Sequence, residues 1–116
     1  INPMLVDEQI RGGIVQGIGA ALYEECLYSA EGQLLNGSLA DYLVPMAAEM
    51  PDIVVAHIET PTRQSDLGAK GTGEAGTAGA PGAVMNAIND ALRPFKARVT
   101  AQPFTPQRVL QALGKV

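Results

Sequence analysis

The stretch GAKGTGEAGTAGAPG, residues 68–82, is the most unusual part of the chain, with almost no side-chain bulk apart from Lys70 and Glu74. A backbone lined with glycines can approach a ligand or another backbone very closely. Glu74 is expected to project at the start of a helix, either as a general base shielded from water or as an exposed residue near a helix N-terminus. Lys70 either binds an anionic group or is solvated, and we favour the solvated interpretation.

Gly71, Gly73 and Gly76 match the G-x-G-x-x-G pattern of dinucleotide-binding folds, but the context does not fit. The pattern should follow directly on a hydrophobic strand, whereas residues 60–66 are polar and irregular. No second strand with an acidic end follows about 20 residues later, and Glu74 would set a carboxylate where a pyrophosphate should lie. The P-loop pattern is absent as well, so both nucleotide-binding interpretations are rejected.

Residues 7–27 are predicted to form a helix, with Asp7 as the N-cap. Its apolar residues recur at helical spacing: Ile10, Ile14, Ile18, Ala21 and Leu22. Four glycines interrupt it at positions 12, 13, 17 and 19, although each interior glycine costs about 1 kcal/mol relative to alanine. One face of this helix is therefore expected to approach another backbone or a ligand very closely. Gln16 is the polar residue in the middle of this helix. It lies either on the solvent-exposed face of the helix or on the face that meets the ligand.

Short strands are predicted in two places. Residues 27–44 hold the turn dipeptides Glu31-Gly32 and Asn36-Gly37. The β-branched run 53–59 fits one strand. His57 on this run could be a metal ligand or a general base, but no Cys or second His stands near it at ligand spacing. A partly exposed strand residue is the favoured interpretation.

Two more helices are predicted after the loop. The first runs to Leu92, with Pro81 in its opening turns. The second begins with Thr105 as N-cap before Pro106 and ends near Gly114, where a glycine after the helix belongs. The predicted fold class is α+β: a glycine-rich helix, short strands, a helix after the Gly-Glu loop and a terminal helix.

Composition narrows the classes of function. The chain has 116 residues and a formal net charge of −4, which argues against nucleic acid and anionic membranes as partners. The single cysteine, Cys26, excludes an internal disulfide and an all-cysteine metal site and fits a reducing compartment, so a cytoplasmic location is expected. With no initiator Met and no signal-peptide pattern, we expect a mature or excised chain. Two Phe, no Trp and 13 Gly suggest a piece that packs against something larger.

The loop and its flanks together resemble a known family. Residues 68–92, from GAKGTGE through GAP to NAINDAL, are similar to the C-terminal signature of molybdenum hydroxylase large subunits, the family of xanthine dehydrogenase, aldehyde oxidase and aerobic carbon monoxide dehydrogenase. Residues 9–25 resemble the glycine-rich helix that precedes this signature, and Asn2-Pro3 and residues 37–45 also match. The resemblance covers nearly the whole chain in the family's order, and the bacterial carbon monoxide dehydrogenase-like branch is the one it resembles most.

The resemblance implies roles for particular residues. Glu74 takes the position of the family's glutamate beside the molybdenum, the general base that deprotonates the water-derived oxygen attacking the substrate carbon. Gln16 takes the position of a glutamine that contacts the molybdopterin. The residues whose backbone is expected close to the cofactor are Lys70, Gly71, Thr72 and Gly73. No residue of the chain is expected to ligate the metal itself.

The resemblance also implies cofactors and partners. The cofactor is molybdopterin with molybdenum, in bacteria usually the cytosine dinucleotide form, and 2Fe-2S clusters and FAD are expected on other subunits or domains. The expected partners are the remainder of the large subunit, the iron–sulfur and flavin subunits, and a small-molecule substrate. Carbon monoxide, an aldehyde, a purine and an N-heterocycle all remain open as that substrate.

The family's large subunit is several times longer than this chain. We therefore expect residues 1–116 to be a single C-terminal portion of a molybdenum-cofactor-binding domain, inactive on its own. The alternative from a different class is a non-catalytic structural or interaction module, or an isolated inactive fragment, whose glycine-rich faces dock a partner protein.

Overall fold

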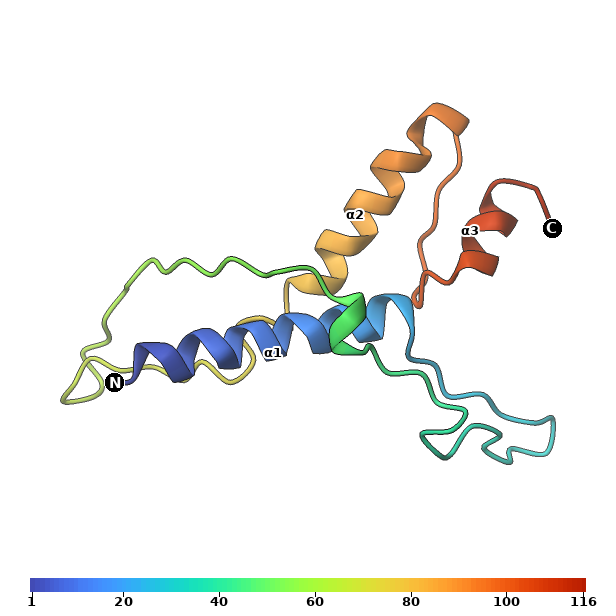
Figure 1. Ribbon diagram of the computed structural model, residues 1–116. Helices are drawn as coiled ribbons and strands as arrows, with labels where there is room; N and C mark the ends of the chain where they lie inside the picture. The colour runs from blue at the N-terminus through green and yellow to red at the C-terminus, as the bar shows by residue number, and fades with distance from the viewer.

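The computed structural model describes residues 1–116 as an open arrangement of helices joined by long irregular segments (Figure 1). Its helical elements in chain order are α1 (Pro3–Leu22), the 3₁₀-helix η1 (Ala47–Glu49), α2 (Ala80–Leu92), the 3₁₀-helix η2 (Arg93–Phe95) and α3 (Pro106–Ala112). The strand pairing consists of one isolated antiparallel bridge between Tyr28 and Leu34. The chain is therefore mostly helical, so the predicted α+β class is right for its helices and wrong for most of its strands.

Helix α1 begins four residues earlier than predicted. The Asn2 side chain accepts a hydrogen bond from the backbone N–H of Leu5 at 3.3 Å, and Pro3 occupies the first helical turn. This pair satisfies a free donor and presets the helical φ angle, so Asn2 is the N-cap and the predicted start at Asp7 is wrong. The predicted end at residue 27 is also wrong, because the helix stops at Leu22 and the N–H groups of Tyr23 and Glu24 both reach the carbonyl of Gly19.

Helix α2 leaves the middle of α1 at a steep angle (Figure 1). The glycines of α1 lie at this crossing: a Cβ atom built on Gly13 would lie 3.1 Å from the Thr77 hydroxyl, and one on Gly17 would lie 2.7 Å from the Ala80 Cβ. A Cβ on Gly76 would collide with the Ile10 carbonyl. The expectation that one face of the glycine-rich helix approaches another backbone very closely is therefore confirmed.

Residues 23–46 form an irregular excursion beyond the end of α1 rather than the predicted short strands. Its centre is Asn36, which is buried and whose side chain accepts from the Leu27 N–H at 2.9 Å and donates to the Glu25 carbonyl at 2.6 Å. Gly32 has a φ of +83°, the left-handed conformation that the predicted turn requires of a glycine. Hydrogen bonds from the Asn36 side chain thus stand where two paired strands would have made backbone hydrogen bonds to each other.

The run 53–59 is extended but has no partner strand, so the predicted strand is wrong as a hydrogen-bonded element. Two side chains of α1 hold it in place. The Arg11 Nε–H donates to the Ile53 carbonyl at 3.0 Å, and the Asp7 carboxylate contacts the His57 Nε2 at 2.6 Å. His57 is exposed, as the favoured interpretation expected, and its partner is this carboxylate.

The small core lies where the end of α1 meets the C-terminal part and is a cluster of four buried residues: Ala21, Leu92, Val99 and Phe104. Asn89 on α2 closes the connection to α3, because its side chain donates to the Val99 carbonyl and accepts from the Val99 N–H, both at 2.9 Å. The Thr105 hydroxyl accepts from the N–H of Arg108, and Gly114 adopts a φ of +64°, so the predicted cap and terminal glycine of α3 are confirmed.

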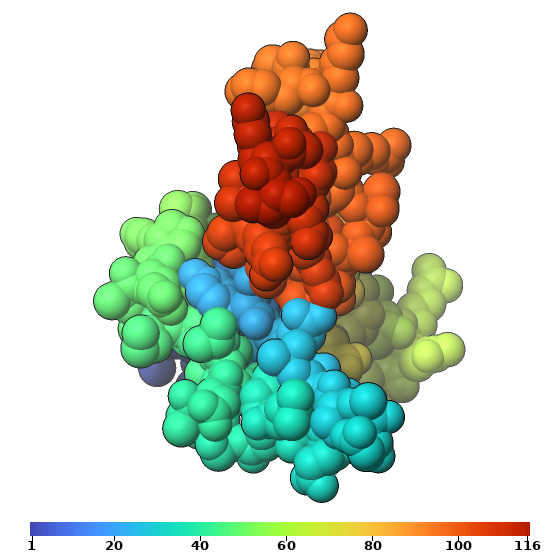
Figure 2. All heavy atoms as spheres, turned by 90° about the vertical axis from the view of Figure 1, so that its right-hand side faces the viewer, coloured from blue at the N-terminus to red at the C-terminus, as the bar shows by residue number.

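The chain as a whole is far from compact. Its radius of gyration is 17.9 Å, whereas a compact domain of this length has about 13 Å. Its accessible surface is 8706 Å², against about 6,000 Å² for a folded monomer of this mass. Figure 2 shows the C-terminal residues and the cyan and green residues as two lobes with the end of α1 between them. None of the helices combines the length and the apolar character that a membrane span requires.

Candidate functional site

The glycine-rich loop is fastened to α1 on both sides of Glu74. The Gln9 side-chain amide donates to the Gly73 carbonyl at 3.0 Å, and the Thr77 hydroxyl donates to the Gly13 carbonyl at 3.0 Å. Gly76 is buried against α1 between these two bonds. The loop therefore lies directly on the helix that carries Gln16.

Glu74 stands in the turn between the two fastened points. Its backbone carbonyl accepts from the N–H groups of Thr77 at 3.2 Å and Ala78 at 3.4 Å. Its side chain is exposed and enters no hydrogen bond or ion pair within the chain. The predicted place at the start of a helix is wrong, since α2 begins only at Ala80. The Glu74 backbone carbonyl is thus hydrogen-bonded within the turn, while the side-chain carboxylate has no partner within the chain.

Gln16 lies on the same stripe of α1 as Gln9. The two residues are seven positions apart, which is about two helical turns or roughly 10 Å along the axis. Gln16 is exposed and makes no hydrogen bond within the chain. The structure thus brings Gln16 to the helix side on which the Glu74 loop is fastened, and leaves its amide without a partner.

The residues before Glu74 form an exposed strip of backbone. The Lys70 ammonium group donates to the Thr60 hydroxyl, so this side chain is turned toward the extended segment. The Thr72 carbonyl accepts from the Ala75 N–H at 3.2 Å. At Gly71 and Gly73, a Cβ atom would meet no other heavy atom within 4 Å, and neither residue has a positive φ. Packing inside the chain therefore does not require glycine at either position.

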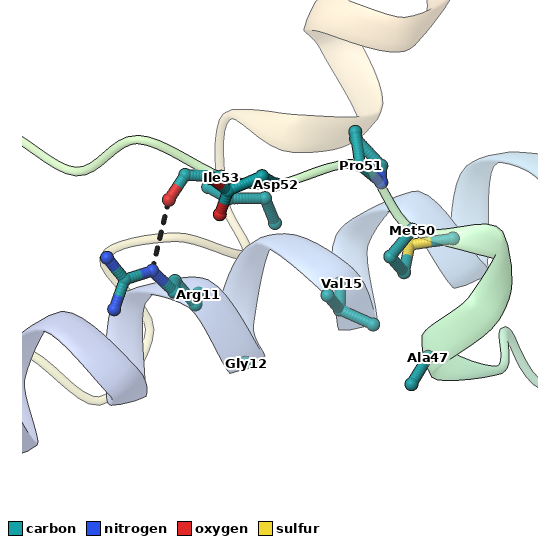
Figure 3. A pocket seen from close by; sticks show the side chains of 8 residues that line it. All are labelled: Arg11, Gly12, Val15, Ala47, Met50, Pro51, Asp52 and Ile53. Atoms are coloured by element: carbon teal, nitrogen blue, oxygen red, sulfur yellow. Dashed lines mark hydrogen bonds between the residues drawn. The ribbon is translucent and has the colours of Figure 1, made fainter.

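An open pocket of about 470 Å³ lies on a different face of α1 (Figure 3). Arg11, Gly12 and Val15 form one wall, and the chain from Ala47 to Ile53 forms the other. The dashed line in Figure 3 marks the bond from Arg11 to the Ile53 carbonyl. No predicted site residue lines this pocket, so the loop at Glu74 and the pocket are separate features.

The side chains with shifted pKa values lie away from the predicted site. No group of three or more His, Cys, Asp or Glu side chains is placed to hold a metal ion. Two side chains have shifted pKa values, both in the 23–46 excursion. The bond to the Glu24 carboxylate raises the pKa of Tyr42, and the Ser29 hydroxyl lowers the pKa of Glu31. Among the predicted site residues, Glu74 and Gln16 have exposed polar side chains that make no hydrogen bond within the chain.

This architecture is shared with known proteins. A family profile described as molybdopterin cofactor-binding domain matches residues 1–51. The nicotine 6-hydroxylase large subunit of Paenarthrobacter nicotinovorans is 46% identical over 112 residues, covering 97% of this chain and 14% of that protein. The structure of quinoline 2-oxidoreductase from Pseudomonas putida 86 matches with a TM-score of 0.94 and 44% identity, covering 99% of this chain and 15% of that one. The chain belongs to the family of molybdopterin-binding large subunits of molybdenum hydroxylases.

The chain spans about one-seventh of the length of these large subunits. The carbon monoxide dehydrogenase large chain of Hydrogenophaga pseudoflava is also a member, at 34% identity over 113 residues, 97% of this chain and 14% of that one. Its identity is lower than the 46% of the nicotine 6-hydroxylase subunit. The carbon monoxide dehydrogenase-like branch stays a prediction, because identities to two individual proteins do not define a branch.

Two residues of the site were missed by the sequence analysis. Gln9 and Thr77 fasten the loop on either side of Glu74, and neither was singled out. The seven-residue spacing of Gln9 and Gln16 could have indicated Gln9, because it places two side-chain amides on one helix face. The contact of Thr77 with Gly13 joins residues 64 positions apart and had no local signature.

Proposed function

We propose that residues 1–116 are a single C-terminal portion of a molybdenum-cofactor-binding domain, within a molybdenum hydroxylase that oxidises a carbon centre with oxygen from water. The observation that carries this proposal is the Glu74 turn. It is fastened to α1 at both sides, while its carboxylate is left free beside glycines that nothing in the chain requires. Membership of the large-subunit family supports the same role.

The residues present fit a molybdopterin cofactor. Open glycine positions at Gly71 and Gly73 allow a flat ligand to lie against the backbone strip from Lys70 to Gly73, where added Cβ atoms would intrude. The free amide of Gln16 can hydrogen-bond the polar edge of such a ligand. We assign these residues to cofactor binding, with the cytosine dinucleotide form as the expected variant. When bound, this cofactor supplies the oxidant and the centre at which water is activated.

Glu74 is the general base of the proposed reaction. A carboxylate that is free of partners within the chain, and whose turn is held rigidly, can accept a proton at a fixed point. It takes that proton from the water-derived oxygen as this oxygen attacks the substrate carbon. Covering by the rest of the subunit would exclude bulk water and strengthen the base. The chain itself contributes the base and one side of the cofactor cradle.

An N-heteroaromatic compound is the substrate class that we propose. Two relatives that are 46% and 44% identical to this chain over the matched residues have nicotine and quinoline in their names, both nitrogen heterocycles. The carbon monoxide dehydrogenase large chain is 34% identical over the matched residues. Electrons would leave through 2Fe-2S and FAD cofactors held by iron–sulfur and flavin subunits, and we place the assembly in the cytoplasm.

The decisive experiment is Glu74→Gln in the assembled enzyme. This substitution keeps the shape of the side chain and removes its basicity. Turnover of an N-heteroaromatic substrate is expected to fall by about 10²–10⁴-fold, with molybdenum content unchanged. Glu59→Gln, which changes an exposed glutamate with no hydrogen bond in the chain, serves as the control. Full turnover in Glu74→Gln would refute the base assignment. A folded preparation with its native partners but without molybdenum would instead favour the non-catalytic interaction module.

A further inference from the structure

We propose that Gln9 is a positioning residue for Glu74, acting through the peptide bond between Gly73 and Glu74. The inference rests on the proposed role of Glu74 as the base. The Gln9 side-chain Nε2–H donates to the Gly73 carbonyl oxygen at 3.0 Å, across 64 positions of sequence. That oxygen belongs to the planar peptide unit that ends at the Cα of Glu74. Holding the oxygen therefore holds the peptide plane before Glu74, and the direction of the Glu74 side chain is set when the plane after it is held as well.

Such an anchor is needed because the residue before Glu74 is a glycine. Gly73 has no Cβ and no neighbour within 4 Å of where one would lie, so neither its backbone preferences nor packing would fix the peptide plane. On the other side of Glu74, the Thr77 N–H holds the Glu74 carbonyl at 3.2 Å, and the Thr77 hydroxyl is bonded to α1. Gln9 thus supplies the hydrogen bond to the Gly73 carbonyl. With this bond in place, the peptide planes before and after Glu74 are both held.

Two substitutions can distinguish a role of Gln9 in the stability of α1 from a role in positioning Glu74. Gln9 is exposed, and methionine matches glutamine in helix propensity and in length. Gln9→Met should therefore leave α1 intact while removing the donor to Gly73. Gln9→Glu, with the same shape and no donor at neutral pH, gives a second route to the same loss.

The test uses the assembled, molybdenum-loaded enzyme. In Gln9→Met, kcat is expected to fall about 10–100-fold with KM and molybdenum occupancy unchanged, because a misplaced catalytic group costs rate rather than substrate binding. Amide hydrogen exchange in the peptide covering residues 70–79 is expected to become about tenfold faster, the equivalent of one lost hydrogen bond. Gln107→Met, at an exposed glutamine on α3 with no hydrogen bond in the chain, is the matched control and should change neither quantity.

A double variant decides whether Gln9 acts through Glu74. If it does, Gln9→Met combined with Glu74→Gln should turn over no more slowly than Glu74→Gln alone. Multiplied losses in the double variant would overturn the proposal, as would wild-type kcat and exchange in Gln9→Met. Loss of molybdenum from Gln9→Met would also overturn it, since Gln9 would then hold the cofactor itself. Full turnover in Glu74→Gln would defeat the proposed function, while the exchange measurement would still report on the Gln9 anchor.

Discussion

Gly17 of α1 and Ala80 of α2 meet so closely that a Cβ atom built on Gly17 would lie 2.7 Å from the Cβ of Ala80 and 3.1 Å from the Thr77 carbonyl oxygen. No side chain other than hydrogen fits between the two helices at this point. The crossing therefore brings the loop that ends at Ala80 down onto α1. The glycine cost within the helix, about 1 kcal/mol, is offset by the close contact that it permits.

Gly17→Ala should destabilise the assembled enzyme, whereas Gly12→Ala should not. The added methyl group at position 17 meets backbone and a short side chain that cannot move aside, which costs about 1–3 kcal/mol. At position 12 nothing lies within 4 Å, and alanine gains about 1 kcal/mol of helix propensity. The check is the shift in thermal unfolding temperature of the two variants. Equal destabilisation would mean that another part of the subunit packs on Gly12.

Gln16→Ala should weaken cofactor retention. The substitution removes an exposed amide that has no partner in the chain and keeps a good helix former, so the fold of α1 is preserved. Molybdenum content per large subunit is expected to fall, and to fall further on dialysis. Gln111→Ala on α3 is the control. Full molybdenum occupancy in Gln16→Ala would count against the assignment of this residue to the cofactor.

The excursion after α1 should loosen at alkaline pH. The Tyr42 hydroxyl donates to the Glu24 carboxylate at 3.0 Å, which favours the neutral phenol and raises the pKa of Tyr42 above its usual value. A raised folded-state pKa means that the stabilisation is present below pH 10 and is lost as the pH rises through the folded pKa. Limited proteolysis of residues 24–46 should therefore accelerate only at alkaline pH. In Tyr42→Phe, this alkaline step should disappear and cleavage should already be faster at neutral pH.

The chain alone should not unfold cooperatively. Only 11 of 116 residues are buried, which gives too small a core to offset the chain entropy of that length. We expect a broad thermal transition and binding of a hydrophobic dye by the isolated chain. A sharp two-state melt by calorimetry would contradict this expectation and favour a stand-alone module.

Local signals predicted the helices well. The end of α3 is an example: the Lys115 N–H bonds the Leu110 carbonyl and the Gly114 N–H bonds the Gln111 carbonyl, the arrangement that a glycine after a helix permits. The start of α1 was misplaced because the prediction relied on Asp7 as the N-cap and on the apolar periodicity that begins at Ile10. Asn2 followed by Pro3 is also a helix-start signal, and the prediction did not use it.

Long-range contacts could not be predicted from local patterns. The glycines of α1 predicted a close approach, but not that Thr77 and Ala80 would make it. Gln9 bonds Gly73 only because the two segments are placed side by side by the rest of the fold. The run 53–59 has the composition of a strand, yet a strand also needs a partner, and the chain supplies none.

The unpaired run 53–59 has a practical consequence for anyone preparing this chain. Its backbone N–H and C=O groups have no backbone partners, and Val54 and Ile58 are 89% and 94% exposed. Such an edge can pair with the same edge of another copy and seed an intermolecular β-structure. Expression without the rest of the subunit should therefore favour aggregation, with part of the chain in inclusion bodies. A lysine at Val54 should act as a gatekeeper against that outcome without touching the Glu74 turn.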